Sequence, residues 1–137
     1  AGGSSLTGTI AHESRVVVLD TAACTTFTLP YATGSGAVYH VIISVIATSN
    51  SHIIQVANSS DIMQGIIWQC ATGDTPDLAQ PWITAADSDT ITLNRTTSGS
   101  VTIGEWFDFV DVANNTWAVR GFSAAAGAEA TPFSAAV

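Results

Sequence analysis

Three histidines are the residues of this chain best suited to proton transfer, because the imidazole titrates close to neutral pH. They are His12 near the start of the chain, His40 within an apolar segment and His52. No nucleophile at a characteristic spacing accompanies them, and the chain contains no HExxH, GxSxG or phosphate-loop motif. A Ser-His-Asp triad could still assemble in space from the many serines. Structural roles for the histidines are the stronger interpretation, so we predict no catalytic residue and no enzyme.

The absence of lysine excludes whole classes of chemistry. Schiff bases, phosphate-loop lysines and Ser-Lys dyads all require that side chain. The basic residues are Arg15, Arg95 and Arg120, and eleven acidic residues bring the net charge to -8 at pH 7. Such a chain repels nucleic-acid phosphates and anionic lipids. We therefore expect neither nucleic acid nor a membrane among its partners.

One group of carboxylates could in principle bind a hard cation. Asp87 and Asp89 flank a single serine, and Asp74 and Asp77 lie nearby in the sequence. Calcium prefers several such oxygen ligands within one loop, but the glycine and the final glutamate of an EF-hand are missing here. A solvated turn is the better interpretation, and we predict no metal site and no cofactor.

A second acidic group, Glu105, Asp108 and Asp111, falls within one predicted strand. Side chains alternate between the faces of a strand, which places Asp108 on one face and the other two acids on the opposite face. Glu105 and Asp111 would then lie roughly 20 Å apart along a straight strand. Two acids on opposite faces, or two acids that far apart, cannot flank one glycosidic bond. This excludes a paired-carboxylate glycosidase.

Exposed tryptophan rings could stack on sugars. Trp82 follows Pro81 in a long predicted loop and is the best candidate, whereas Trp68, Trp106 and Trp117 lie in predicted strands and are expected in the core. Together with Asp87 and Asp89, Trp82 would form the contacts of a glycan- or receptor-binding module. This is the alternative function that the sequence leaves open.

The composition predicts strands rather than helices. Val, Ile and Thr number 42, whereas the good helix formers Leu, Met, Glu, Gln, Lys and Arg total 16. Asn114-Asn115 suits a tight hairpin between the last two strands. The fold class is predicted to be all-β, a single jelly-roll-like β-sandwich of about eight strands. The candidate strands, each bounded by turn residues, are 15–20, 25–29, 38–48, 52–57, 62–69, 90–94, 101–112 and 116–122.

With 137 residues the chain is long enough for one domain with a hydrophobic core. Residues 1–12 carry only Leu6 and Ile10 as large apolar side chains and are expected to form an extended N-terminal arm. Residues 13–122 would form the sandwich, and the Ala- and Gly-rich residues 123–137 a C-terminal tail. No export signal or membrane anchor is visible, so synthesis in the cytoplasm is expected.

One predicted strand lacks a polar face. Residues 38–47 are largely apolar on both faces, so that strand is central or its second face meets a partner.

Cys24 and Cys70 are interpreted as two small buried thiols in preference to a disulfide. A bridge between them stays open as the second interpretation.

Four short patterns follow one another along the chain. They are Thr28-Leu29-Pro30-Tyr31-Ala32-Thr33-Gly34, Asp89-Thr90-Ile91-Thr92, the segment from Gly104-Glu105-Trp106-Phe107 to Asp111, and Trp117-Ala118-Val119-Arg120-Gly121. In this order they resemble patterns of small structural proteins of tailed bacteriophages, the capsid decoration or cement proteins. The resemblance spans residues from about Arg15 to Gly127 and brings no catalytic residue with it.

The resemblance implies a β-sandwich or β-tulip-like domain that forms a homotrimer on the outer capsid surface of the virion. Such a protein, synthesised in the host cytoplasm, would stabilise the capsid by binding the major capsid protein. The N-terminal arm would reach onto that protein through Leu6, Thr7, Thr9 and Ile10. The alternative is a glycan- or receptor-binding β-sandwich of a phage fibre or appendage. Residues 71–88 form a longer segment than the family leads us to expect.

Overall fold

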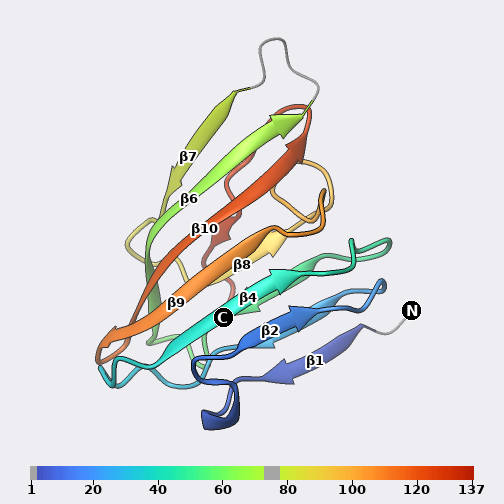
Figure 1. Cartoon of the computed structure of the whole chain (residues 1–137). Coiled ribbons are helices and arrows are strands. Elements are labelled where there is room, and N and C mark those ends of the chain that lie inside the picture. The colour runs from blue at the N-terminus through green and yellow to red at the C-terminus, as the bar shows by residue number, and fades with distance from the viewer. Residues whose placement is uncertain (1–2, 73–77) are drawn as a thin grey trace.

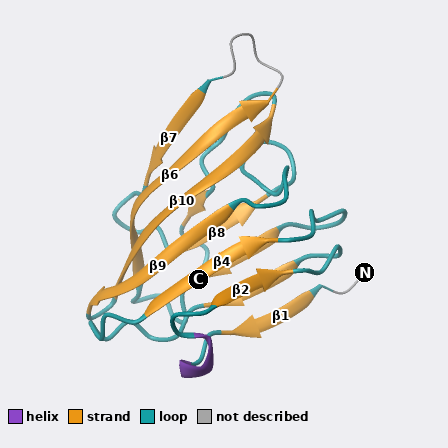
Figure 2. Ribbon diagram, in the orientation of Figure 1, coloured by secondary structure: helices purple, strands orange, loops and turns teal. Residues whose placement is uncertain are grey.

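The computed structural model of this protein describes residues 3–72 and 78–137, which form two β-sheets packed face to face (Figures 1 and 2). The predicted single β-sandwich is confirmed. Besides the strands there is one turn of 3-10 helix, η1 (Ile10–His12). Within the described ranges, no helix is long and apolar enough to cross a membrane.

The chain passes back and forth between the sheets from β1 to β6, so neighbouring strands are not consecutive in the sequence. The five-stranded sheet has the order β1 (Ser4–Thr7), β3 (Thr25–Thr28), β5 (His52–Gln55), β8 (Thr90–Leu93) and β11 (Phe133–Ser134). The six-stranded sheet has the order β2 (Val16–Leu19), β4 (Val38–Ile43), β9 (Trp106–Ala113), β10 (Thr116–Ala126), β6 (Ile62–Thr72) and β7 (Ala79–Ile83).

This alternating path produces parallel pairing in both sheets. β1 pairs in parallel with β3, β3 with β5 and β2 with β4. The longest ladder is also parallel and joins β6 to β10, from Ile62 opposite Thr116 to Thr72 opposite Ala126. The backbones approach so closely there that a Cβ on Gly65 would lie 1.8 Å from the Val119 carbonyl oxygen. Only glycine can therefore occupy position 65 without moving β6.

Each of the eight predicted strands corresponds to an observed strand, but β4 and β9 each lack five of the predicted residues at one end. β4 ends at Ile43, because the N–H groups of Ser44 and Val45 both turn to the Leu19 carbonyl oxygen. β9 begins only at Trp106, because the preceding loop folds around the Glu105 carboxylate. The predicted hairpin at Asn114-Asn115 is confirmed between β9 and β10, with Asn115 at φ +62°.

Both ends of the chain belong to the sandwich, which differs from the expected arm and tail. Leu6 lies in β1, is half-buried and packs against the core. β10 continues past the predicted end at Phe122, and Phe133 enters the core from β11, opposite Ile91. Main-chain pairing with distant strands compensates for the small side chains of these segments.

The space between the sheets is filled by large side chains from both of them. Tyr39 packs edge-on against Trp117 at a ring-centroid distance of 5.6 Å, and Trp117 is fully buried as predicted. The cysteines differ from the prediction of two buried thiols. Cys24 is half-buried and Cys70 lies on the surface, and both are free thiols. The largest fully buried side chains are Trp117, Tyr39, Phe27, Phe107, Phe109, Leu19, Leu29, Ile43, Ile54, Met63, Ile67 and Ile91.

Candidate functional site

The outer faces of the two sheets differ sharply in chemistry. On the five-stranded sheet the outward positions are mostly hydroxyl and amide side chains, namely Ser5, Thr7, Thr26, Thr28, Gln55 and Thr92, with Ile53 among them. On the six-stranded sheet most outward positions are apolar, although none of the residues that the structure describes covers them. Contiguous exposed apolar surface of this kind is typical of interaction sites in soluble proteins.

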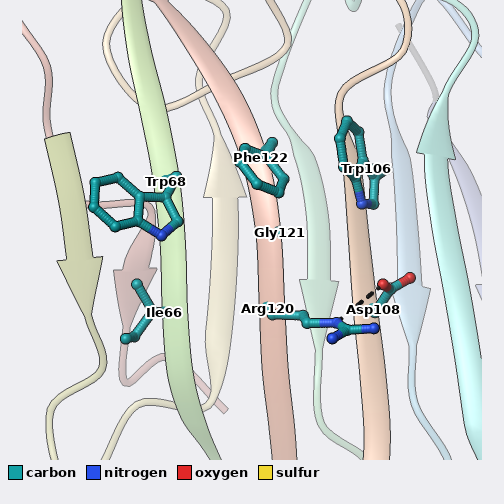
Figure 3. A pocket seen from close by; sticks show the side chains of 7 residues that line it. All are labelled: Ile66, Trp68, Trp106, Asp108, Arg120, Gly121 and Phe122. Atoms are coloured by element: carbon teal, nitrogen blue, oxygen red, sulfur yellow. Dashed lines mark hydrogen bonds and ion pairs between the residues drawn. The ribbon is translucent and has the colours of Figure 1, made fainter. Parts of the chain in front are cut away.

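Two rows of side chains cross the six-stranded sheet from edge to edge. Strand register places six residues in each row, and Figure 3 shows the central three of each. The aromatic row is Val18, Ile42, Trp106, Phe122, Trp68 and Pro81. The mixed row is Val16, His40, Asp108, Arg120, Ile66 and Ile83.

Three exposed aromatic rings form the centre of the aromatic row. Trp106, Phe122 and Trp68 are each close to half exposed, and the ring centroids of Trp106 and Phe122 lie 4.6 Å apart. With Gly121 and with Ile66, Asp108 and Arg120 of the mixed row they line a shallow hollow of about 480 Å³ (Figure 3). The hollow combines flat apolar surface with a few hydrogen-bonding groups.

The polar part of the mixed row is organised around Asp108. Its two carboxylate oxygens bind different partners, with His40 Nδ1 2.7 Å from Oδ1 and Arg120 Nε 3.3 Å from Oδ2. The Asp108 side chain is only 16% exposed, whereas that of Arg120 is 84% exposed. One carboxylate and one guanidinium leave the two rows with no formal charge when His40 is neutral, in a chain whose net charge is -8.

Asp111 and Glu105 face the interior, as the alternation predicts, and each fixes a loop. Asp111 accepts hydrogen bonds from the N–H groups of Thr33, Gly34 and Ser35 and from two of their hydroxyls. Burial raises the pKa of Asp111, but the hydrogen bonds from the Ser35 hydroxyl and the three N–H groups outweigh it and lower the pKa to about 2. The carboxylate therefore stays ionised and anchors the turn at residues 33–35.

Glu105 plays the same part for the loop that precedes β9. Its carboxylate accepts the N–H groups of Ser100, Val101 and Thr102. Burial raises the pKa of Glu105, and these hydrogen bonds only partly offset that effect. Each of these two buried carboxylates accepts backbone N–H groups of the loop that it anchors.

The histidines make structural contacts in the described residues. His52 is fully buried, and its Nδ1 accepts the Thr25 N–H while its Nε2–H donates to the Val45 carbonyl oxygen, both at 2.9 Å. His40 binds Asp108, and no described histidine makes a hydrogen bond with a serine. The described ranges also bring together no group of three or more His, Cys, Asp or Glu side chains able to hold a metal ion.

The predicted sugar-contact residues do not form one surface. Trp82 lies in β7 rather than in a loop, is half-buried against the core, and its Nε1–H donates to Gln69 Oε1 at 2.9 Å. Asp89 is buried and accepts the N–H groups of Ala136 and Val137, whereas Asp87 is exposed. Asp74 and Asp77, the other carboxylates of this group, lie outside the described residues.

The predicted arm residues occupy one edge of the sandwich. Leu6 is half-buried and Thr7 exposed, both in the edge strand β1. Thr9 and Ile10 follow at the turn η1, which projects from the molecule beside β1 (Figure 1). Ile10 is 85% exposed, more than any other large apolar side chain in the described residues.

The prediction that Trp68 and Trp106 are core residues is wrong. Strand parity offered a signal for Trp106, because it alternates with the buried Phe107 and Phe109 and shares its face with Asp108. Trp68 could not be assigned in this way, because Ile66 and Ile67 leave its strand apolar on both faces.

Comparison of the chain with protein-family models, with curated proteins and with solved structures finds no match. What the protein does is therefore inferred from its own surfaces.

Proposed function

We propose that this protein is a structural subunit, a decoration protein that binds the outer surface of a bacteriophage capsid as a homotrimer and stabilises it. The observation that carries the proposal is the uncovered apolar face of the six-stranded sheet. Monomeric soluble proteins rarely leave contiguous apolar surface of that extent exposed, and when they do it marks an interaction site. An assembling protein is thus a better fit than one that acts alone on a small substrate.

The charge of the chain and its sequence patterns support the capsid as the setting. An acidic, lysine-free protein repels the nucleic acid released or packaged nearby and stays soluble before assembly. The four patterns that resemble decoration proteins lie in strands and turns of the sandwich. A protein that binds the assembled lattice but not free capsid subunits stabilises that lattice by mass action.

The edge formed by β1 and η1 is the proposed contact with the major capsid protein. Edge strand β1 has one unpaired side, which can add main-chain hydrogen bonds to an extended segment of a partner. Ile10 projects beside it as an apolar anchor. Deleting residues 1–11 would also remove β1 from its sheet and uncover β3, so a point substitution is the cleaner perturbation.

The test is co-sedimentation of the purified protein with undecorated capsid shells. We expect saturable binding, and Ile10→Ser should weaken it by about tenfold, because burying one isoleucine contributes about 1.5 kcal/mol or more. Ile103→Ser is the matched control, since Ile103 is also exposed but precedes β9 at the opposite end of the strands. Wild-type protein that ignores the shells would overturn the proposal.

The hollow in the aromatic row favours one second candidate, a glycan-binding module. Trp68 and Trp106 could stack on sugar rings, and Asp108 and Arg120 could bind their hydroxyls. Intrinsic tryptophan fluorescence during titration with oligosaccharides distinguishes the two. Saturable quenching that is lost in Trp68→Ala would favour the glycan-binding module over the decoration protein.

A further inference from the structure

We propose that the outer face of the six-stranded sheet is the homotypic interface of the trimer, at which copies of this chain bind one another through the aromatic and mixed rows. The inference deepens the proposed function, on which it rests, by naming the surface that joins the subunits. It also separates two binding surfaces, because the β1 and η1 edge then stays free for the capsid.

The extent of the apolar face is the first argument. Eight large apolar side chains on it are between 40% and 71% exposed. Together they expose on the order of 700 Å² of apolar surface, close to the roughly 800 Å² that each partner contributes to a standard interface and above the largest patch of most monomers. The eight are Val16, Val18, Trp106, Val112, Phe122, Ile66, Trp68 and Ile83.

The charge distribution of this face is compatible with a second copy as the partner. Two copies that each carry a net charge of -8 repel one another wherever their acidic surfaces meet. The two rows hold Asp108 as their one carboxylate, and Arg120 neutralises it. Two copies that meet through this face therefore bring no unpaired like charges together.

The polar centre of the face would fix the orientation of one subunit relative to the other. Arg120 reaches into solvent while Asp108 holds its Nε, so the rest of the guanidinium can donate hydrogen bonds to acceptors of the neighbouring subunit. Such hydrogen bonds, enclosed by aromatic rings, fix orientation more than they add affinity. The rings of Trp106, Phe122 and Trp68 are the residue types that dominate the energetics of interfaces.

The experiment measures the oligomeric state of the full chain by light scattering coupled to gel filtration. We expect wild-type protein to be a trimer, and Phe122→Arg to raise its dissociation constant by about 30-fold or more, because the variant buries an uncompensated charge at the centre of the face. Thr28→Arg places the same side chain on the outer face of the five-stranded sheet and should leave the trimer intact. Circular dichroism shows whether each variant folds, and Val112→Arg provides a second test on the exposed end of β9.

Each result bears on the interface in one direction. A wild-type protein that stays monomeric at high micromolar concentration overturns the interface, as does a Phe122→Arg or Val112→Arg protein that folds and remains as oligomeric as the wild type. Monomeric protein that still saturates capsid shells supports capsid decoration but refutes the interface and the trimer. If Phe122→Arg dissociates the oligomer but the wild-type oligomer does not bind capsid shells, the interface is supported and the proposed function is refuted.

Discussion

Asp111→Asn tests whether a buried carboxylate holds one end of the sandwich together. The wild-type side chain accepts hydrogen bonds from three consecutive N–H groups and two hydroxyls at distances of 2.7 to 3.1 Å. Asparagine keeps the shape but offers one accepting oxygen, and its amide would point N–H groups at backbone donors. The substitution should therefore destabilise the fold without changing the strands.

The expected magnitude follows from the lowered pKa of Asp111. A shift from 3.8 to about 2 corresponds to about 2.5 kcal/mol for a fully desolvated group. The donors at residues 33–35 are exposed to solvent, which screens the interaction, so we expect a loss of about 1–2 kcal/mol at pH 7. In urea denaturation this lowers the midpoint by about 0.5–1 M, at matched protein concentration.

The pH dependence distinguishes charge from shape. Because the folded-state pKa is depressed, the stability contributed by Asp111 is present above the unfolded pKa near 3.8 and is lost as the pH falls through about 2. Wild type and variant should therefore converge between pH 4 and pH 2. Asp87→Asn is the control, since Asp87 is exposed, and should match wild type throughout. Equal stability of Asp111→Asn and wild type at pH 7, or a difference that persists unchanged at pH 2, would refute the reasoning.

Two further predictions concern the backbone and the C-terminal segment. Gly65→Ala should lower the free energy of unfolding by about 3 kcal/mol or more, because the alanine Cβ would collide with the Val119 carbonyl oxygen. Gly36→Ala is the control and should lower it by about 1 kcal/mol, because Gly36 has a positive φ but open space around it. Similar unfolding midpoints for the two variants would contradict the close approach of β6 and β10. Phe133→Ala should cost about 3 kcal/mol and lower the thermal midpoint by about 10 °C, because Phe133 fills the core from β11. Val137→Ala, at a partly exposed position, should leave that midpoint unchanged, and a Phe133→Ala midpoint equal to that of wild type would show that the C-terminal segment is a separate tail.

Local patterns predicted the parts of the fold that depend on neighbouring residues. Alternation correctly separated Asp108 from Glu105 and Asp111, and the Asn114-Asn115 turn was recognisable from its own chemistry. The strands that escaped prediction depend on distant partners. β1 pairs with β3, and β11 with β8, and these strands of 4 and 2 residues are too short to carry a periodic signal.

β7 was missed because Pro81 suggested a loop. The strand lies at the edge of its sheet, where proline is tolerated because no further strand needs its missing N–H. Pairing of Ile67 with Trp82 then turns that tryptophan inward, and the neighbouring Trp68 outward. The candidate surface thus depended on strand order across the sheet, which a single sequence does not reveal.

The parallel ladder between β6 and β10 also determines when this protein can fold during its synthesis. Ile62 lies opposite Thr116, so the ladder partner of each β6 residue is synthesised 54 residues later. At about 5–20 residues per second a ribosome needs about 3–11 s to supply it. During that interval the strand that carries Ile66 and Trp68 has neither its ladder partner nor the covered face of a finished sandwich. Slow translation between residues 72 and 116 would lengthen this exposure. It should therefore increase the fraction of nascent chains lost to aggregation.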